Sequence, residues 1–434
     1  MPCAEGMGEN PREPLRILFA TMALPFPPNN GQRMRNWGLL RAMAEEGHRV
    51  SLLSFAEPHE LSQNLFPLRE ICEDVRLVPS PFAPSKAWKA YWARFRSLLS
   101  PLPYGAIRYH SAAMESALVE LIGDRQCDVV ICDNIYQFRN LPPTAYDRVL
   151  LNKHDFTFIV MRRLLAETRN PLKLAYGWTE YRRLRRWEMS VCEKVARVLV
   201  CSELDARILN SALPSVPADV VPNVIDVASY QPRDDDDGRT LLFFGAMDYH
   251  ANEDAVDFFV SRVLPEVRKA NSDARFVAAG RNPSDALLRR YAGAPGVEFT
   301  GTVEDMEAVI AQATVCVVPL RIGSGTRLKI LEAAAMRKAI VSTHVGAEGL
   351  DLDDGREIQL ADEPSEFARA VCELLSNPQR RRTLGEAART KVVEKYSLAA
   401  LRGAIRKALN EMGAGAPLAS PERDLRLARE RARA

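Results

Sequence analysis

The sequence predicts an α/β protein with two doubly wound, Rossmann-like halves, each a parallel sheet covered by helices, that face a central cleft. Short runs of β-branched residues alternate with helical stretches along the whole chain, which is typical of parallel sheets. A charged run at residues 232–238 interrupts this alternation, which then restarts. A chain of 434 residues with 47% hydrophobic content is also long enough for two full cores.

The first half begins with an apolar strand at residues 16–20, a turn rich in Pro and Asn, and a helix that starts near Gly31. His154 comes soon after another expected strand, and side chains at that end of parallel strands face the ligand crevice of such folds. The residues alone leave two interpretations of His154 open, a functional side chain or an ordinary loop histidine. No G-x-G-x-x-G follows the first strand, so the dinucleotide-binding fingerprint is missing. Further strands are expected at residues 48–53, 128–133, 149–152 and 197–201.

The second half repeats the alternation and is followed by a last helix and an arginine-rich tail. We divide the chain into an N-terminal domain (1–226), a linker (227–238), a C-terminal domain (239–396), a helix (397–412) placed to pack back on the first domain, and a charged tail (413–434). The strands expected in the second half are residues 240–244, 275–279, 297–299, 314–318, 339–342 and 357–360.

The most informative stretch covers residues 317–350, where a buried strand, a glycine-rich turn and a helix follow one another. Such a turn presents unpaired N–H groups and the positive end of a helix dipole, which suits a phosphate. Arg327 and Lys329 add positive charge there, which is unfavourable for the helix unless an anion or a carboxylate compensates. The two side chains would lie about 200° apart around a helix axis, so at least one has to act from outside regular helix.

Composition narrows the class of protein. A net charge of +2 does not indicate nucleic-acid binding, and eight scattered cysteines without a C-x-x-C pair fit buried thiols in a reducing cytoplasm. No apolar run approaches the roughly 20 residues of a membrane span, and we expect a cytoplasmic protein. The mixed aromatic and basic residues 86–110 and the arginines of residues 180–188 are candidate surfaces for the inner membrane face. An amphipathic helix and a solvated face are the alternative interpretations.

Several motifs together resemble the two-domain nucleotide-sugar glycosyltransferases of the GT-B fold, specifically retaining glycosyltransferase family 4. The likeness spans about residues 16–410 and is greatest to the branch associated with exopolysaccharide or cell-envelope polymer synthesis. It implies transfer of a sugar from a nucleotide-diphosphate sugar to a glycan or lipid-linked acceptor, with retention of configuration. The motifs are PFPPNNGQR with EEGHRV, KHD, VPNVID, FFGAMDYHANEDA, FTGTVED, and PLRIGSGTRLKILEAAA followed by STHVGAEGL.

The resemblance also implies roles for individual residues. Glu332 would bind the ribose, the backbone around Val303 would meet the base, and residues 326–329 would hold the diphosphate, with Gly245 near the same phosphates. His154 would contact the donor sugar near the reacting centre, and Gly31 would lie near donor and acceptor. The implied catalytic residues are His154, Arg327 and Lys329, and the implied donor-binding residues are Gly31, Gly245, Val303, Ser324, Gly325, Thr326, Leu328 and Glu332.

Two departures from the family pattern affect these expectations. Ser324 occupies the position of a carboxylate that normally touches the donor sugar, which puts the identity of that sugar in doubt. Met247 and Asn252 lie where an arginine and a lysine are usual, and Arg327 and Lys329 replace their charge. With cations and amides at the diphosphate, no metal or other cofactor is expected. Two alternatives stay open: an epimerase or phosphorylase on the same fold, and a non-catalytic nucleotide-sugar-binding protein.

Overall fold

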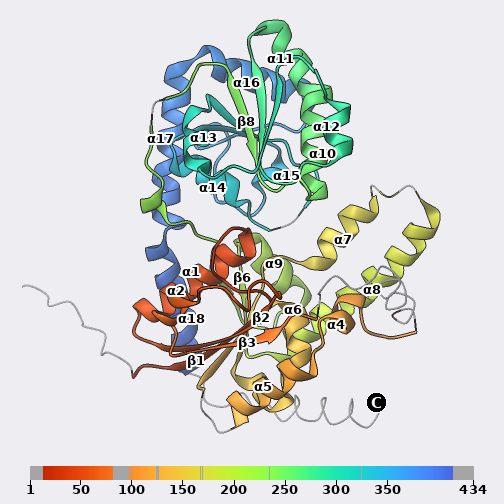
Figure 1. The fold of residues 1–434 in the computed structure, drawn as a ribbon, viewed down its shortest axis with the longest axis vertical. Helices are drawn as coiled ribbons and strands as arrows, with labels where there is room; N and C mark the ends of the chain where they lie inside the picture. The colour runs from red at the N-terminus through yellow and green to blue at the C-terminus, as the bar shows by residue number, and fades with distance from the viewer. Residues whose placement is uncertain are drawn as a thin grey trace, which may run out of the picture.

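The computed structural model describes residues 13–81, 97, 99–123, 127–166, 168, 170–233, 235–323 and 325–413. Two sheets form the two halves of the molecule, the N-terminal one below and the C-terminal one above in Figure 1. All strand pairs within each sheet are parallel. The predicted α/β architecture with two doubly wound halves is confirmed. Ser324, residues 86–96 and 98 of the aromatic and basic stretch, and residues 414–434 of the tail lie outside the described residues.

The N-terminal sheet has seven strands in the order β3-β2-β1-β4-β5-β6-β7. The two edge strands, β3 and β7, were not predicted from sequence. Both are partly exposed, and β7 has only three residues, so neither shows the continuous apolar run of a central strand. The strands are β1 (Arg16–Thr21), β2 (Arg49–Ala56), β3 (Asp74–Pro79), β4 (Val129–Asp133), β5 (Val149–Asn152), β6 (Arg197–Val200) and β7 (Ala218–Val220).

Helices cover both faces of this sheet (Figure 1). α1 begins at Gly31 because the Asn30 side chain accepts a hydrogen bond from the backbone N–H of Arg33, which caps the helix. The α-helices described in this half are α1 (Gly31–Glu45), α2 (Phe66–Arg69), α4 (Tyr104–Arg108), α5 (Ala112–Gly123), α6 (Asn134–Gln137), α7 (Thr157–Ala166), α8 (Pro171–Lys194) and α9 (Glu203–Ala212).

The C-terminal sheet has six strands in the order β10-β9-β8-β11-β12-β13. Its strands are β8 (Thr240–Phe244), β9 (Arg275–Ala279), β10 (Val297–Gly301), β11 (Val315–Val318), β12 (Ala339–Ser342) and β13 (Gln359–Leu360). Its helices are α10 (His250–Phe258), α11 (Leu264–Ala270), α12 (Asp285–Arg290), α13 (Met306–Gln312), α14 (Leu328–Ala335), α15 (His344–Ala347), α16 (Pro364–Ser376) and α17 (Pro378–Lys395).

The last helix, α18 (Leu398–Gly413), returns to the N-terminal half and packs against α1 (Figure 1). Leu401 and Ile405 of α18 are buried in the same apolar cluster as Leu39 and Leu40 of α1. The chain therefore crosses between the two halves twice, once before β8 and once after α17.

The strand order reverses once in each sheet, between β1 and β4 and between β8 and β11. Ligands of open parallel sheets bind outside the carboxyl ends of the strands at such a reversal. The segments that follow these four strands are therefore the places to look for a site. They carry Gly31, Asp133, Gly245 and the turn before α14.

Among the residues that the structure describes, no helix is both long and apolar enough to cross a membrane. The seven cysteines of this part are free thiols, and six of them are buried, as the sequence predicted.

Candidate functional site

The glycine-rich turn before α14 meets the end of β5 across the interface between the two halves. Gly325 has a φ of +77°, and a Cβ built on it would lie 3.0 Å from the carbonyl oxygen of His154. Both the left-handed backbone and the close approach favour glycine at this position. Nearby, Asn223 Nδ2 donates to Thr326 Oγ1 over 2.5 Å, and a Cβ built on Gly31 would lie 3.4 Å from Leu328. Five of the predicted site residues thus converge on one interface.

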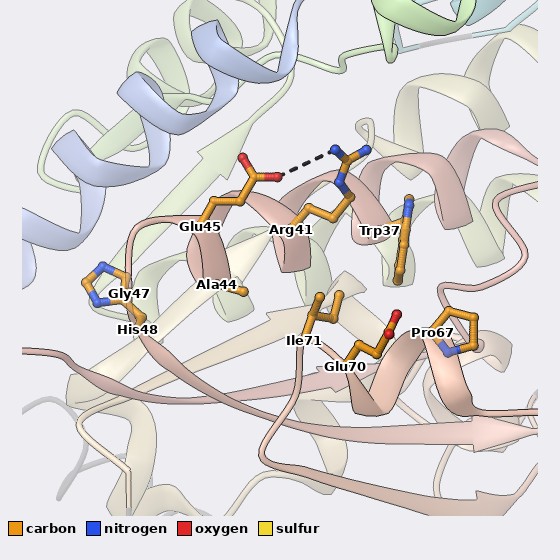
Figure 2. Close-up of a pocket in the computed structure, with 9 residues that line it drawn as sticks. All are labelled: Trp37, Arg41, Ala44, Glu45, Gly47, His48, Pro67, Glu70 and Ile71. Carbon is orange, nitrogen blue, oxygen red and sulfur yellow. Dashed lines mark hydrogen bonds and ion pairs between the residues drawn. The ribbon is translucent and has the colours of Figure 1, made fainter.

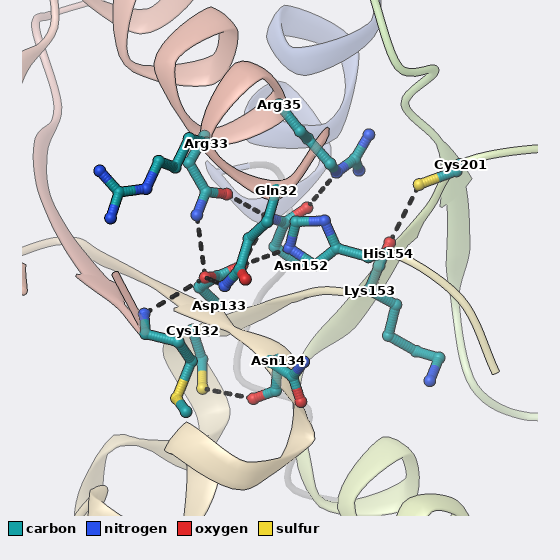
Figure 3. Close-up of polar contacts among 12 residues, drawn as sticks. Gln32, Arg33, Arg35, Cys132, Asp133, Asn134, Asn152, Lys153, His154 and Cys201 are labelled. Atoms are coloured by element: carbon teal, nitrogen blue, oxygen red, sulfur yellow. Dashed lines mark hydrogen bonds and ion pairs between the residues drawn. The ribbon is translucent and has the colours of Figure 1, made fainter. Parts of the chain in front are cut away.

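His154 is held by a carboxylate from the neighbouring strand (Figure 3). Its Nε2 lies 2.5 Å from Oδ1 of Asp133, which ends β4 and is fully buried. Burial alone would raise the pKa of Asp133, but the adjacent His154 and the donated hydrogen bonds lower it below its usual value. Asp133 is therefore ionised at neutral pH and fixes the imidazole ring. Nδ1 is then the ring nitrogen available to a ligand.

Asp133 collects donors from three separate segments. Its Oδ2 accepts from Gln32 Nε2 at 3.0 Å, from Asn36 Nδ2 at 2.8 Å and from the backbone N–H of Met22 at 3.3 Å. Its Oδ1 accepts from Asn152 Nδ2 at 3.2 Å. Sequence reasoning placed this residue at a strand end but did not assign it a role. One feature of the sequence could have indicated its role: Asp133 is a carboxylate at the end of a buried apolar strand, and His154 follows the next strand.

Arg35 connects this network to the turn of the other half. It is 2% exposed, and its Nε donates to Asn152 Oδ1 at 2.8 Å. Its Nη1 donates to the Val221 carbonyl at 2.7 Å and to Asn223 Oδ1 at 3.0 Å. Because Asn223 in turn donates to Thr326, a continuous chain of hydrogen bonds runs from α1 to the glycine-rich turn.

Lys329 lies in the first turn of α14 and reaches across to the end of β8. Its Nζ donates to Asn252 Oδ1 at 2.9 Å, lies 3.9 Å from the centre of the Phe243 ring, and would be 3.2 Å from a Cβ on Gly245. Burial, with the nearby charge of Arg327, lowers the pKa of Lys329 to about 7. Asn252 therefore holds the Lys329 ammonium beside Gly245, at the end of β8.

Arg327 caps α14 from outside the helix. Its backbone is extended, with φ of −96° and ψ of 100°, and its Nη1 donates to the Gly325 carbonyl at 2.6 Å. The sequence predicted that at least one of the two cations acts from outside regular helix, and of the two Arg327 is the residue that lies outside α14. Its guanidinium braces the turn, and burial lowers its pKa.

Glu332 lies one turn further along α14. Its Oε1 accepts a hydrogen bond of 2.9 Å from the hydroxyl of Tyr230, in the segment that joins the two halves. Burial raises the pKa of Glu332, although Tyr230 and Lys329 oppose the shift. Val303 lies between β10 and α13 and packs on the core of the C-terminal sheet.

Two further ion pairs fix the surroundings of His154. Arg163 of α7 reaches Glu348 through both terminal nitrogens, each at 2.6 Å, and also donates to the Gly323 carbonyl. This pair ties the two halves together beside the turn. Lys153 forms a buried ion pair with Glu188 of α8, whose carboxylate also accepts from two backbone N–H groups at the start of α7.

Two hollows of the described structure lie in the N-terminal half. The larger, of about 490 Å³, lies between α1 and α2 (Figure 2). It is lined by Trp37, by Arg41 and Glu45, which pair at 3.5 Å, and by Ile71, and it contains none of the predicted site residues. The smaller, of about 240 Å³, adjoins Asp133 through Gln32 and Asn134. We therefore place the site by the converging residues rather than by the size of a hollow.

The described residues include no group of three or more His, Cys, Asp or Glu side chains arranged to hold a metal ion. The positive groups at the turn include Lys329 and Arg327, the backbone N–H groups at the start of α14, and Arg163, whose charge is paired with Glu348.

Comparisons with known proteins agree with this arrangement. Residues 29–229 match the model of Glycosyltransferase Family 4, and residues 238–377 match that of Glycosyl transferases group 1. An uncharacterized 44.6 kDa protein of the cps region of Klebsiella pneumoniae is 22% identical over 83% of this chain and 91% of its own length.

Solved structures share the fold. A sucrose-phosphate synthase from Thermosynechococcus elongatus superposes with a TM-score of 0.68 at 17% identity, over 93% of this chain and all of that chain. HepE of Anabaena, solved in complex with UDP-glucose, gives a TM-score of 0.59 at 11% identity, over 92% of this chain and all of that chain.

The two facing sheets, the interface site and the two family models define this chain as a glycosyltransferase with the GT-B fold. Within that class it belongs to the family 4 type, as its sequence motifs predicted. The chain is accordingly an enzyme of sugar transfer.

Proposed function

We propose that the enzyme transfers a sugar from a nucleotide-diphosphate sugar to a glycan or lipid-linked acceptor. The convergence of His154 and Gly31 with the turn of residues 325–328 supports this proposal most strongly. It brings a helix start of the kind that suits a phosphate against a histidine held by a buried carboxylate. HepE, which shares the fold, was solved with UDP-glucose, and this supports a donor of the same class.

In the proposed donor site, the α14 amides with Lys329 and Arg327 hold the diphosphate, with Gly245 beside them. Glu332 binds the ribose, and the backbone around Val303 meets the base. Departure of the nucleoside diphosphate builds negative charge on a phosphate oxygen, which a preorganised cation and amides stabilise. This charge is what a divalent metal would otherwise offset, so we propose that transfer needs none. Activity that is unchanged by EDTA would support this point, and activity restored by added Mg²⁺ would contradict it.

In the proposed sugar site, His154 contacts the donor sugar at the reacting centre, while Asp133 fixes its ring. Asp133 accepts hydrogen bonds from four donors besides contacting His154, so it is a positioning residue rather than a nucleophile. We propose retention of the anomeric configuration on family resemblance. The coupling constant of the product's anomeric proton, measured by NMR, tests it.

We further propose a role in polysaccharide or cell-envelope synthesis at the inner membrane face. The cps-region relative supports the pathway. The paired helices α7 and α8 extend from the side of the N-terminal half (Figure 1) and support the location. Leu172 is 82% exposed and Trp178 43% exposed, and exposed arginines follow on α8. Co-sedimentation with phosphatidylglycerol vesicles that is lost in Leu172→Ser/Trp178→Ser would support this location. Equal sedimentation of wild type and variant would contradict it.

The decisive experiment measures sugar transfer itself. UDP-, GDP-, ADP- and TDP-sugars are first screened by thermal stabilisation, since a ligand at about 100 times its dissociation constant adds about 2.7 kcal/mol. The selected donor is then incubated with and without a panel of glycan and lipid-linked acceptors. Acceptor-dependent release of nucleoside diphosphate together with a glycosylated product is expected. Free epimer or sugar phosphate formed without acceptor would overturn the proposal.

A further inference from the structure

The smaller hollow of the N-terminal half lies beside the proposed reacting centre. It has a volume of about 240 Å³ and is lined in part by Gln32 and Asn134. Gln32 donates to Asp133, whose other oxygen contacts His154, and Asn134 directly follows Asp133 (Figure 3). Pockets for drug-sized ligands hold roughly 300–1,000 Å³, so this hollow suits one small group, such as a single sugar ring.

Part of the lining of this cavity is aromatic. Tyr109 and Tyr136 stack with ring centres 5.1 Å apart and an interplanar angle of 6°. A Cβ on Gly105 would lie 2.4 Å from the Tyr136 ring, so the glycine permits this packing. Burial raises the pKa of both phenols, so they keep their protons at neutral pH. Apolar ring surface beside neutral polar groups is suited to a polyol, which has apolar C–H faces and hydroxyl edges.

Asn134 is held in an uncommon backbone conformation at the cavity. Its φ is +76°, which non-glycine residues rarely adopt and asparagine tolerates best. Its Oδ1 accepts from the backbone N–H of Tyr136 at 3.3 Å, so the turn is locked by its own side chain. Such conformations concentrate at functional sites.

The charges of the cavity are unbalanced. Arg33 is paired with Glu60, which is 1% exposed and also accepts from the backbone N–H of Glu57 at 2.8 Å. Because this buried pair cancels, Glu57 leaves the described lining with one net negative charge. Arg33 is the only cation among the described lining residues, and its charge is already matched. Among the described lining residues, a ligand carboxylate or phosphate would therefore meet net repulsion, because their one cation is already paired.

We propose that this cavity receives the acceptor's sugar ring, and that Glu57 and the Arg33–Glu60 pair select a neutral or amine-bearing ring over an acidic one. The proposal rests on the proposed transferase function and specifies the acceptor that this function leaves open. It places the acceptor sugar at the end of β4, where Gln32 and Asn134 connect the cavity to Asp133, the carboxylate that contacts His154. Glu57 acts on specificity and takes no part in bond making.

Three probes of equal size that differ in charge test this selection. Methyl β-D-glucopyranoside, methyl β-D-glucosaminide and methyl β-D-glucuronide are titrated against the UDP-bound enzyme by saturation-transfer-difference NMR. In the wild type, the glucuronide is expected to bind about tenfold more weakly than the neutral glucoside. Glu57→Gln is expected to close most of this gap, and Glu57→Lys to reverse it. The matched control is Glu115→Gln, which makes the same substitution at an exposed position of α5. It should leave the difference in affinity between the glucuronide and the glucoside unchanged.

Asn134→Gly separates a binding role from a folding role. Glycine accepts the positive φ, so the fold and the affinity for UDP should be retained while all three probes bind several-fold more weakly. The proposed charge selection would be overturned if the wild type bound the glucuronide with the same affinity as the glucoside. It would also be overturned if both Glu57 variants left the difference between these two affinities unchanged. Failure of all three probes to bind would overturn the sugar site. UDP affinity and donor turnover, measured on the same samples, report on the proposed function independently.

Discussion

The C-terminal half of the candidate site is one continuous segment, whereas the N-terminal half is assembled from separate strand ends and a helix start. Residues 325–332 place Thr326, Arg327, Lys329 and Glu332 along one turn and one helix. In contrast, Asp133 gathers partners from the loop after β1, from α1 and from β5. The continuous part supplies the cations and amides that we propose to hold the diphosphate. The assembled part fixes one imidazole with a buried carboxylate. We expect the first to govern nucleotide affinity and the second to govern turnover.

Loss of the imidazole gives the largest expected effect. In His154→Ala we expect kcat to fall about 10²–10³-fold, the size seen when one preorganised group at a reacting centre is removed. UDP affinity should change less than about twofold, because the diphosphate site is intact. Initial rates and calorimetric titration with UDP measure the two quantities. The control is His344→Ala, an exposed histidine of α15 that pairs with Asp362. If His154→Ala also lost affinity for UDP, the two regions would not divide nucleotide affinity and turnover between them.

Asp133→Asn keeps the shape of the side chain but removes the charge that holds His154. The amide cannot accept from every donor that faces the carboxylate, so we expect kcat to fall about 10²-fold with UDP affinity retained. The pKa of Asp133 is lowered in the folded state. Its contribution to the free energy of unfolding is therefore present above the unfolded pKa and is lost as pH falls through the folded value. The stability gap between wild type and variant should narrow with acidification, as followed by denaturant melts between pH 7 and pH 3. A gap that widens would contradict the lowered pKa.

Lys329 tests the other region through pH. With a pKa of about 7, Lys329 is largely neutral at pH 9 in the free enzyme. Binding of a diphosphate at this pH therefore requires Lys329 to take up a proton. Affinity for UDP should therefore fall more than about tenfold between pH 7.5 and 9, a range in which a phosphate with a second pKa near 6 is already ionised. Lys329→Arg should remove this dependence, because arginine stays charged. Lys329→Ala should weaken UDP about 10–100-fold and uridine much less, as expected for a charged hydrogen bond. Equal losses for UDP and uridine would argue against a phosphate role.

The contrast between the two regions also explains what the sequence could predict. The turn and helix were recognisable because their glycines, cations and Glu332 are neighbours in the chain. Lys329 was predicted as a cation of the site, but its contact with Asn252 depends on how β8 and β11 pair. The position of His154 after a strand left its role open, and the resemblance of the KHD motif to the family singled it out.

Asp133 and the charges at Glu57 could not be found in the same way. Both depend on contacts between residues more than 20 positions apart in the chain. Asp133 contacts Gln32 and His154, and the net charge beside Glu57 depends on the pairing of Arg33 with Glu60. A sequence pattern reports which strand a carboxylate ends, but not which donors surround it. The edge strands β3 and β7 were missed for a related reason, since partly exposed edges lack the apolar pattern of central strands.

Glu332 offers a smaller, more selective test of the continuous region. If its carboxylate binds the ribose hydroxyls, the wild type should prefer UDP over 2′-deoxy-UDP by about tenfold, the size of one hydrogen bond to a charged group. Glu332→Gln should retain part of this preference and Glu332→Ala should abolish it, with kcat at saturating donor changing less. Tyr230→Phe removes the hydroxyl that donates to Glu332 and should have only a minor effect on this preference. Competition titrations measure both nucleotides. A preference for ribose that survives in Glu332→Ala would transfer this role to another residue.

The smallest expected effect concerns the ion pair that joins the two regions. Arg163 and Glu348 are each about a quarter exposed, at 26% and 23%, and exposed pairs contribute about 0.2–1 kcal/mol. A double-mutant cycle of Arg163→Gln and Glu348→Gln should therefore give a coupling energy below about 1 kcal/mol in donor affinity. The KM for the donor should rise no more than a few-fold. Arg163 also donates to the Gly323 carbonyl, so Arg163→Gln should cost more than Glu348→Gln. If both single variants raised the KM equally, the ion pair, and not the hydrogen bond from Arg163 to Gly323, would be the contact that positions the two regions.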